Sequence, residues 1–164
     1  NHYVGRTFIE PTQSIRAFGV KLKHSANRAE IDGKRVVLID DSIVRGTTSI
    51  KIVQMIRDAG ASEIHFRVAS PPIKHPDFYG IDMPSKEELI ASSMSIEQMK
   101  RYLKVDSLAF ISLPGFYEAL GQGKRVDSAP QFADHCFTGD YPTRLVDRDH
   151  DMASKEQQLS LLDD

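Results

Sequence analysis

The chain has few of the features that mark disulfide-rich, nucleic-acid-binding or membrane proteins. Cys136 is the only cysteine among 164 residues, so an internal disulfide framework is excluded. The formal net charge of -2 provides no basic surface for a phosphate backbone. No apolar run approaches the ~20 residues of a membrane span, and no signal peptide is visible. We therefore expect a cytoplasmic protein with no nucleic-acid partner and no membrane span.

The histidines lack the spacing of a metal centre. A zinc site gathers histidines and cysteines in close pairs, and the sequence shows no i,i+4 pairing of histidines and no Cys/His clustering of that kind. Ordinary surface or packing roles are expected for the histidines, which are His2, His24, His65, His75, His135 and His150.

The most informative segment is an apolar run that leads into two carboxylates and a hydroxyl-rich loop. Val36–Ile39 are all apolar, and Asp40 and Asp41 follow directly. Gly46 and the hydroxyl side chains of Thr47–Ser49 come next. A continuous apolar run predicts a strand of a parallel sheet that is buried on both faces. Ligands of such sheets bind beyond the carboxyl ends of the strands, where the two aspartates fall.

This segment contains the groups needed to bind a sugar phosphate. Asp40 and Asp41 can accept hydrogen bonds from two ribose hydroxyls or help to hold Mg²⁺. Gly46 lets the backbone approach an anion, and the amides of Arg45–Thr48 lie where the next helix should begin. The plainer alternative is a solvated acidic turn followed by a helix with a Ser or Thr cap. The combination of features in one order favours the phosphate site.

The residues that follow predict a βαβ unit and a further strand. Residues 50–59 carry apolar side chains at near-helical spacing, and Gly60 is a good C-cap. Residues 63–69 and 107–112 have the composition of buried strands. Pro114 suits the first turn of a helix after the second of them. The succession of strand, helix and strand favours a parallel sheet.

Capping boxes predict two short helices between these strands. The pattern of a serine followed three residues later by Glu or Gln occurs at Ser85 and Ser95. It places helices near residues 86–92 and 96–103. Residues 147–164 are mostly polar, so we expect a poorly ordered tail or an arm packed on a partner.

Several stretches resemble one known family. The segment Asp40–Ser49 is similar to the phosphoribosyl-pyrophosphate (PRPP) motif of type I phosphoribosyltransferases, with Arg45-Gly46 where most members carry Thr-Gly. This variant of the motif is typical of the amidophosphoribosyltransferase family. The resemblance runs along residues 1–145, and its other matching stretches are Tyr3–Ile9, Asn27–Glu30, Phe78–Asp82 and Glu87–Ala91.

The resemblance implies an α/β protein with the type I phosphoribosyltransferase fold, a parallel sheet flanked by helices. The chain would hold the C-terminal portion of that fold. Residues 31–120 would form the α/β core with the PRPP motif, residues 1–30 a basic flexible loop region, and residues 121–164 a C-terminal extension or arm. The candidate functional residues of the flexible loop are Tyr3, Arg6 and Ile9.

The resemblance also implies an activity. In the family, ammonia from a glutaminase domain displaces pyrophosphate from PRPP to give 5-phosphoribosylamine, the first step of de novo purine (IMP) synthesis. Asp40 and Asp41 would be the catalytic carboxylates and would assist Mg²⁺. The implied substrate-binding residues are Asp40, Asp41, Ser42, Val44, Arg45, Gly46, Thr47, Thr48 and Ser49.

The chain begins with Asn1 and lacks the glutaminase domain, so we expect a fragment that is inactive by itself. Purine nucleotide inhibitors and homo-oligomers are further properties that the resemblance implies. Some members of the family hold a [4Fe-4S] cluster through four cysteines. Here Asp77 and Ala133 stand at two of those positions and Cys136 at a third, so no cluster is expected.

Two other functions stay open at this point. A nucleobase-salvage phosphoribosyltransferase would share the motif, although such enzymes usually carry Thr-Gly in place of Arg45-Gly46 and have no reason for the long region after residue 70. A PRPP-sensing regulator of the same fold would need a DNA-binding domain, and nothing in this sequence resembles one.

Overall fold

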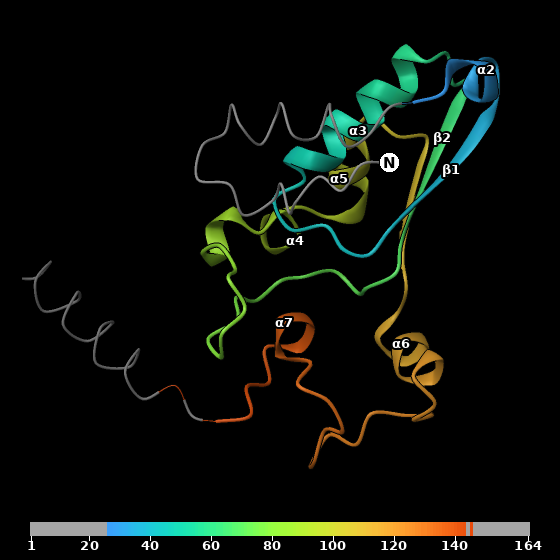
Figure 1. Ribbon diagram of the computed structural model, residues 1–164. Coiled ribbons are helices and arrows are strands. Elements are labelled where there is room, and N and C mark those ends of the chain that lie inside the picture. The colour runs from blue at the N-terminus through green and yellow to red at the C-terminus, as the bar shows by residue number, and fades with distance from the viewer. Residues whose placement is uncertain (1–25, 144, 146–164) are drawn as a thin grey trace, which may run out of the picture.

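A computed structural model describes residues 26–143 and residue 145 of the chain (Figure 1). Most of the flexible loop region predicted for residues 1–30 lies outside this part, as does the tail predicted for residues 147–164. The candidate loop residues that lie outside it are Tyr3, Arg6 and Ile9.

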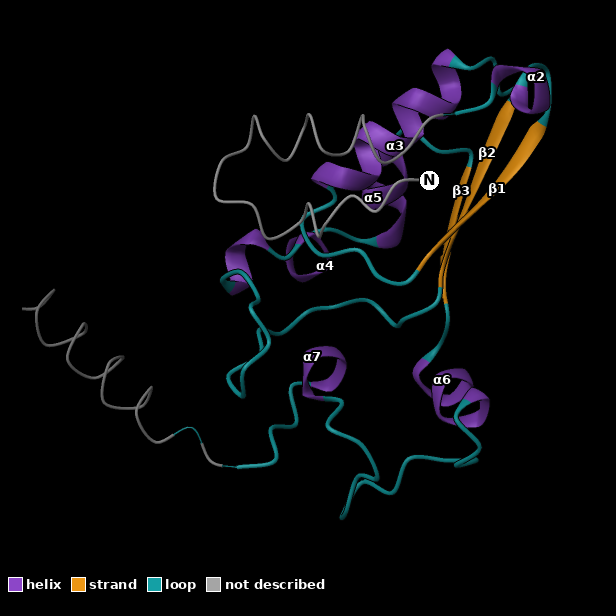
Figure 2. Ribbon diagram, in the orientation of Figure 1, coloured by secondary structure: helices purple, strands orange, loops and turns teal. Residues whose placement is uncertain are grey.

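Three parallel strands form one sheet in the order β1-β2-β3. They span Arg35–Asp40 (β1), Glu63–Val68 (β2) and Ser107–Phe110 (β3). Helix α3 (Thr47–Asp58) connects β1 to β2, and helix α5 (Ile96–Leu103) lies in the connection from β2 to β3. Both helices lie on the same side of the sheet (Figure 2). The predicted βαβ unit and parallel sheet are therefore confirmed.

The hydrophobic core fills the space between the sheet and these helices. Ile64 and Phe66 of the central strand β2 are completely buried. Val53 of α3 and Leu103 of α5 pack into the same cluster of buried side chains. Burying a side chain of this size contributes about 1.5–3 kcal/mol to the free energy of folding. The central strand therefore contributes strongly to the stability of the fold.

The expectation that the first strand is buried on both faces is wrong. Val36 and Leu38 pack against the core, whereas Val37 and Ile39 are 60% and 72% exposed. Side chains alternate between the faces of a strand, so one uncovered face exposes every second residue. Strand β1 lies at the edge of the sheet, and α3 and α5 cover one face only (Figure 2). In residues 26–143 the opposite face of β1 has no helix over it.

The remaining helical elements are short. They are α2 (Arg28–Ile31), the 3₁₀ turn η1 (Lys86–Glu88), α4 (Ile90–Ser93), α6 (Leu113–Ala119) and α7 (His135–Thr138). Helices α6 and α7 lie on the side where the strands end (Figure 1). None of the helices described is long and apolar enough to cross a membrane. Pro114 lies in the first turn of α6, as predicted.

The two predicted capping boxes have different outcomes. At Ser95 the box is complete, because its hydroxyl accepts a hydrogen bond from the Gln98 amide (3.3 Å) and its own amide donates to the Gln98 side chain (2.7 Å). The helix predicted near residues 86–92 is found as two separate helical turns, η1 and α4, in place of one continuous helix. Ser85 makes no side-chain cap, and the extended backbone of the buried Leu89 separates η1 from α4.

These caps give a paired test of stability. Ser95→Ala should lower the free energy of unfolding by about 1 kcal/mol, because the Gln98 amide in the first turn of α5 loses the hydroxyl to which it donates. Ser85→Ala should change it by less than about 0.5 kcal/mol, as at an ordinary surface position. Urea unfolding followed by circular dichroism measures both, and equal losses would contradict the assignment of the caps.

Candidate functional site

The acidic pair lies at the carboxyl end of β1. Asp40 is the last residue of the strand, and its carboxylate accepts a hydrogen bond from the Asp41 amide at 3.1 Å. The Asp41 side chain is exposed and accepts a hydrogen bond from the Ser42 hydroxyl at 3.2 Å. The Ala69 amide donates to the Asp40 carbonyl at 2.9 Å, so the ends of β1 and β2 stay together.

The loop after the aspartates is fixed by apolar contacts. Ile43 is 2% exposed and belongs to the main core. Val44 packs against a second buried cluster that contains Ile73 and Leu89, and its carbonyl accepts a hydrogen bond from the Ile90 amide at 3.0 Å. The loop is therefore held between the core and the segment that leads into α4.

Gly46 is required by backbone conformation and by space. Its φ of +74° lies in the left-handed region, where other residues are strained. A Cβ atom at this position would lie 3.1 Å from Cδ1 of Ile90 and 3.3 Å from Cε1 of Tyr102. The loop therefore passes close to α4 and α5, and a larger residue at this position would require Ile90 or Tyr102 to shift.

Helix α3 begins immediately after Gly46 without a side-chain cap. In contrast, Ser95 and Ser112 cap α5 and α6. The plainer alternative of a Ser or Thr cap on α3 is therefore wrong. The first amides of a helix have no intrahelical partner and lie at the positive end of its dipole. The first turn of α3 also contains no acidic residue, so its start is chemically suited to an anion.

The three hydroxyl residues of α3's first turn differ in exposure. Thr47 is exposed and Thr48 is half-buried, so both hydroxyls are near the surface. Ser49 is only 4% exposed, so it belongs to the interior side of the helix start. The structure thus brings the two carboxylates, the glycine turn and two accessible hydroxyls into one continuous segment.

Arg45 makes a contact that sequence reasoning missed. Its guanidinium donates to both carboxylate oxygens of Glu88, at 3.0 Å and 3.3 Å. The hydrogen bond from Arg45 holds the pKa of Glu88 below its usual value. The local sequence pattern places Glu88 in a capping box with Ser85. No periodic signal links residues so far apart in sequence, so this pairing could not be read from local pattern.

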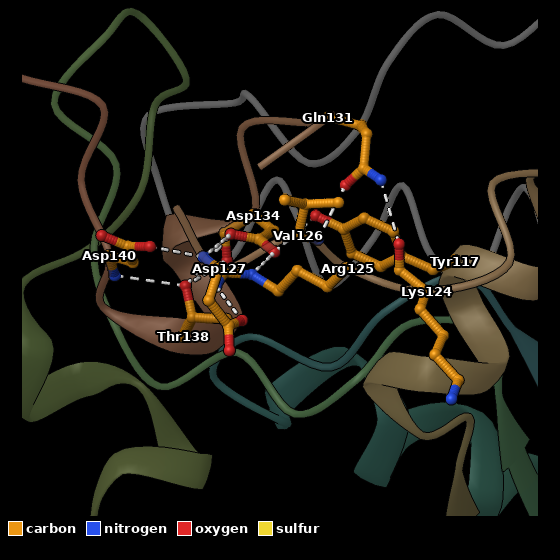
Figure 3. A network of polar contacts seen from close by, with 9 residues as sticks. All are labelled: Tyr117, Lys124, Arg125, Val126, Asp127, Gln131, Asp134, Thr138 and Asp140. Atoms are coloured by element: carbon orange, nitrogen blue, oxygen red, sulfur yellow. Dashed lines mark hydrogen bonds and ion pairs between the residues drawn. The ribbon is translucent and has the colours of Figure 1, made fainter. Parts of the chain in front are cut away.

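A polar network around Arg125 and the buried Asp134 holds the chain after α6 in place (Figure 3). The Arg125 side chain, 14% exposed, donates to Asp134 at 2.7 Å, to Asp127 at 2.8 Å and to Asp140 at 2.5 Å. Asp134 also accepts a hydrogen bond from the Tyr117 hydroxyl at 2.7 Å. The network joins α6 and α7 through an irregular segment, and no local pattern in the sequence predicts it.

Asp77, His135 and Cys136 form a buried group whose ligand atoms lie within 4.8 Å of one another. The Asp77 carboxylate is already bonded to the amides of Tyr79 and Ile81 and to His135 Nε2, the last at 2.7 Å. Burial, aided by the charge of Asp77, raises the pKa of the Cys136 thiol. Hydrogen bonding therefore makes Asp77 a structural link between the segment after it and His135, whereas Nδ1 of His135 is buried and has no partner among the described residues. The expected absence of a [4Fe-4S] cluster stays a prediction.

Gly33, which lies before β1, and Gly46 of the loop allow the cost of backbone strain and the cost of crowding to be measured separately. Gly33 has a φ of +69°, and a Cβ atom added there would have nothing within 4 Å, whereas the same addition at Gly46 is crowded. Gly33→Ala should cost about 1–2 kcal/mol of unfolding free energy through backbone strain alone. Gly46→Ala should cost more, because it adds a clash with Ile90. Equal losses in urea unfolding would show that the loop is not tightly packed there.

The Arg125 network predicts a pH dependence of stability. Burial raises the pKa of Asp134, but hydrogen bonds from Arg125, Tyr117 and Thr138 outweigh burial, so the pKa lies below its ordinary value. The resulting stabilisation is complete above the unfolded-state pKa of about 3.9. It is lost as the pH falls through the lower pKa of the folded state.

Asp134→Asn should therefore flatten the acid limb of the stability profile. At neutral pH it should cost about 3–5 kcal/mol, because Arg125 loses a buried partner. Asp127 has a 92% exposed side chain, so Asp127→Asn should cost no more than about 1 kcal/mol and keep the acid limb. Urea unfolding at a series of pH values measures the free energy of unfolding of both variants. The same dependence on pH in both would contradict the stabilising role of Asp134.

Comparison with known proteins finds relatives that share one name. No family model matches the chain. An amidophosphoribosyltransferase of Rhizobium etli is 65% identical over 163 residues, which are 99% of this chain and 32% of that protein. The amidophosphoribosyltransferase of Bacillus subtilis is 53% identical over 145 residues, 88% of this chain and 30% of that protein. The chain thus spans about a third of the length of these relatives.

Solved structures give the same result. The glutamine PRPP amidotransferase from B. subtilis complexed with ADP and GMP superposes with a TM-score of 0.72 at 53% identity, over 88% of this chain and 32% of that chain. A second structure, described as the allosteric regulatory enzyme of purine biosynthesis, superposes with a TM-score of 0.70 at 51% identity. It covers 88% of this chain and 31% of that chain.

Proposed function

We propose that this chain, which is homologous to the amidophosphoribosyltransferases and has a type I phosphoribosyltransferase fold, is the PRPP-binding part of an enzyme that makes 5-phosphoribosylamine. The supporting observation is the end of β1, where two carboxylates lead into a glycine turn and a helix start without a side-chain cap. The activity is that of the whole enzyme in de novo purine synthesis, and the isolated chain is proposed to be inactive.

The 5-phosphate of PRPP is proposed to bind at the start of α3. The amides of Arg45–Thr48 lie at the positive end of the helix, and the hydroxyls of Thr47 and Thr48 add donors there. Gly46 lets the backbone turn into the helix at this point, because its φ of +74° is a conformation that other residues rarely adopt. The proposed substrate-binding residues are Asp40, Asp41, Ser42, Val44, Arg45, Gly46, Thr47, Thr48 and Ser49.

Asp40 and Asp41 are proposed to hold the ribose. Their oxygens would accept hydrogen bonds from its hydroxyls and stabilise the positive charge that develops on the ring. That charge forms as the bond from the anomeric carbon to pyrophosphate breaks and the bond to the ammonia nitrogen forms, with inversion. Little proton transfer is asked of these residues, so positioning and electrostatics carry the rate.

The same two carboxylates fit a magnesium ion. They are hard oxygen donors at a strand end, one of them exposed to solvent, which suits the few protein contacts that Mg²⁺ usually makes. When bound, the ion would neutralise charge on the pyrophosphate leaving group. The chain's own contribution is to orient the carboxylates, with the Ser42 hydroxyl bonded to Asp41.

The proposed partners are ammonia from a glutaminase domain and inhibitory purine nucleotides. The solved B. subtilis relative is described as a complex with ADP and GMP, which supports nucleotide binding. Homo-oligomeric assembly and a cytoplasmic location stay predictions. The names of the relatives compared support neither a nucleobase-salvage enzyme nor a PRPP-sensing regulator.

The test is Asp40→Asn in the intact amidotransferase that contains this chain. Synthesis of phosphoribosylamine should fall by roughly 100-fold or more, as for the loss of one preorganised electrostatic contact. Basal hydrolysis of glutamine should be unchanged, because that reaction does not use PRPP. Separate assays of glutamate release and of PRPP consumption measure the two activities.

Asp58→Asn is the matched control, since it removes the same charge at the far end of α3. Asp58 is exposed and accepts a hydrogen bond from Gln54 at 2.8 Å, away from the acidic pair. This variant should keep both activities. Equal PRPP affinity and rate in Asp40→Asn and the parent enzyme would remove the proposed role of Asp40.

A further inference from the structure

One ion pair joins the proposed phosphate loop to a segment 43 residues later in the chain. Nε of Arg45 donates to Oε1 of Glu88 at 3.0 Å, and Nη2 donates to Oε2 at 3.3 Å. Both side chains are about half exposed, at 46% and 51%. The two parallel hydrogen bonds give this pair a fixed orientation that a single contact between flexible side chains would not have.

The pair is the middle one of three attachments between the same two segments. On one side of it, the Val44 carbonyl accepts a hydrogen bond from the Ile90 amide at 3.0 Å. On the other side, the Ile90 side chain lies against Gly46. Three successive loop residues are therefore held by the segment from Glu88 to Ile90, through a side chain, a backbone bond and packing.

The charges of this pair restrict what Arg45 can do. The hydrogen bond from Arg45 holds the pKa of Glu88 below its usual value, so the carboxylate is ionised at neutral pH. The pair as a whole carries no net charge. Two of the three guanidinium nitrogens of Arg45 point to Glu88. The negative charge of Glu88 therefore largely cancels the attraction of Arg45 for an anion bound at the loop.

We propose that Glu88 is a positioning residue for PRPP, which acts through Arg45 to hold the phosphate loop in its binding shape. Arg45 then serves as a strut within the loop, and its guanidinium is not a ligand of the phosphate. The phosphate is bound by backbone amides and hydroxyls, as proposed above, and this inference rests on that proposed function.

Glu88→Gln tests the strut because the two possible roles of Arg45 predict changes of opposite sign. If Arg45 is a strut, the loop loosens and PRPP binds more weakly. If Arg45 binds the phosphate and Glu88 competes for it, removing the competing charge tightens PRPP binding. In the intact enzyme we expect the KM for PRPP to rise about three- to fivefold, the range of an exposed but bidentate pair. We expect kcat to stay within about twofold, because the loop binds the ground state and the transition state alike.

Arg45→Gln and the double variant complete the test. A strut predicts that each single variant raises the KM for PRPP to a similar extent and that the double variant is no worse than either, since all three break the same pair. Additive increases would assign Arg45 a contact of its own with PRPP and overturn the proposal.

Glu87→Gln is the matched control, because it removes one negative charge from the same turn and keeps the bonds between Glu88 and Arg45. Its KM for PRPP should equal that of the parent enzyme. An unchanged or lower KM in Glu88→Gln overturns the strut, and so does an equal rise in Glu87→Gln. These failures leave the proposed function intact, whereas a parent enzyme that does not consume PRPP would remove the proposed function itself.

Discussion

The packing of β2 against α3 and α5 is the interaction on which the rest of the structure depends. Ile64 and Phe66 are fully buried at the centre of the sheet, and the pairing of β1 with β2 runs in parallel from Arg35 to Asp40. Because the pairing fixes where β1 ends, it also fixes where the acidic pair and its loop begin. The site is thus a consequence of strand register.

The loop is shaped by residues that lie far from it in sequence. Ile90 and Tyr102 set the space beside Gly46, and Glu88 holds Arg45. A side chain at position 46 would press against these neighbours, so their packing helps to set the path of the backbone into the start of α3. A binding surface made of main-chain groups depends on the path of the backbone, and that path is set by the core and by the segment from η1 to α5.

Features encoded within one turn of helix or one strand could be predicted from sequence, and features that join distant segments could not. The cap at Ser95 and the place of Pro114 follow from local rules. Glu88 fits the same local rule as Gln98, yet a cation 43 residues earlier competes for its carboxylate. Likewise, the apolar run of β1 predicted a strand but could not show that, within residues 26–143, helices cover only one of its faces. The ten-residue acidic motif was recognisable because its parts are adjacent, whereas the network around Arg125 joins three aspartates that no periodicity relates.

The exposed apolar side chains on one face of β1 have a consequence for temperature dependence. Val37 and Ile39 keep their side chains in water, and any surface that covers them gains free energy mainly by releasing ordered solvent. Such a gain weakens on cooling, because the heat-capacity change of apolar hydration is large. Contacts made on this face will therefore become stronger as the temperature rises towards the physiological range and weaker on cooling.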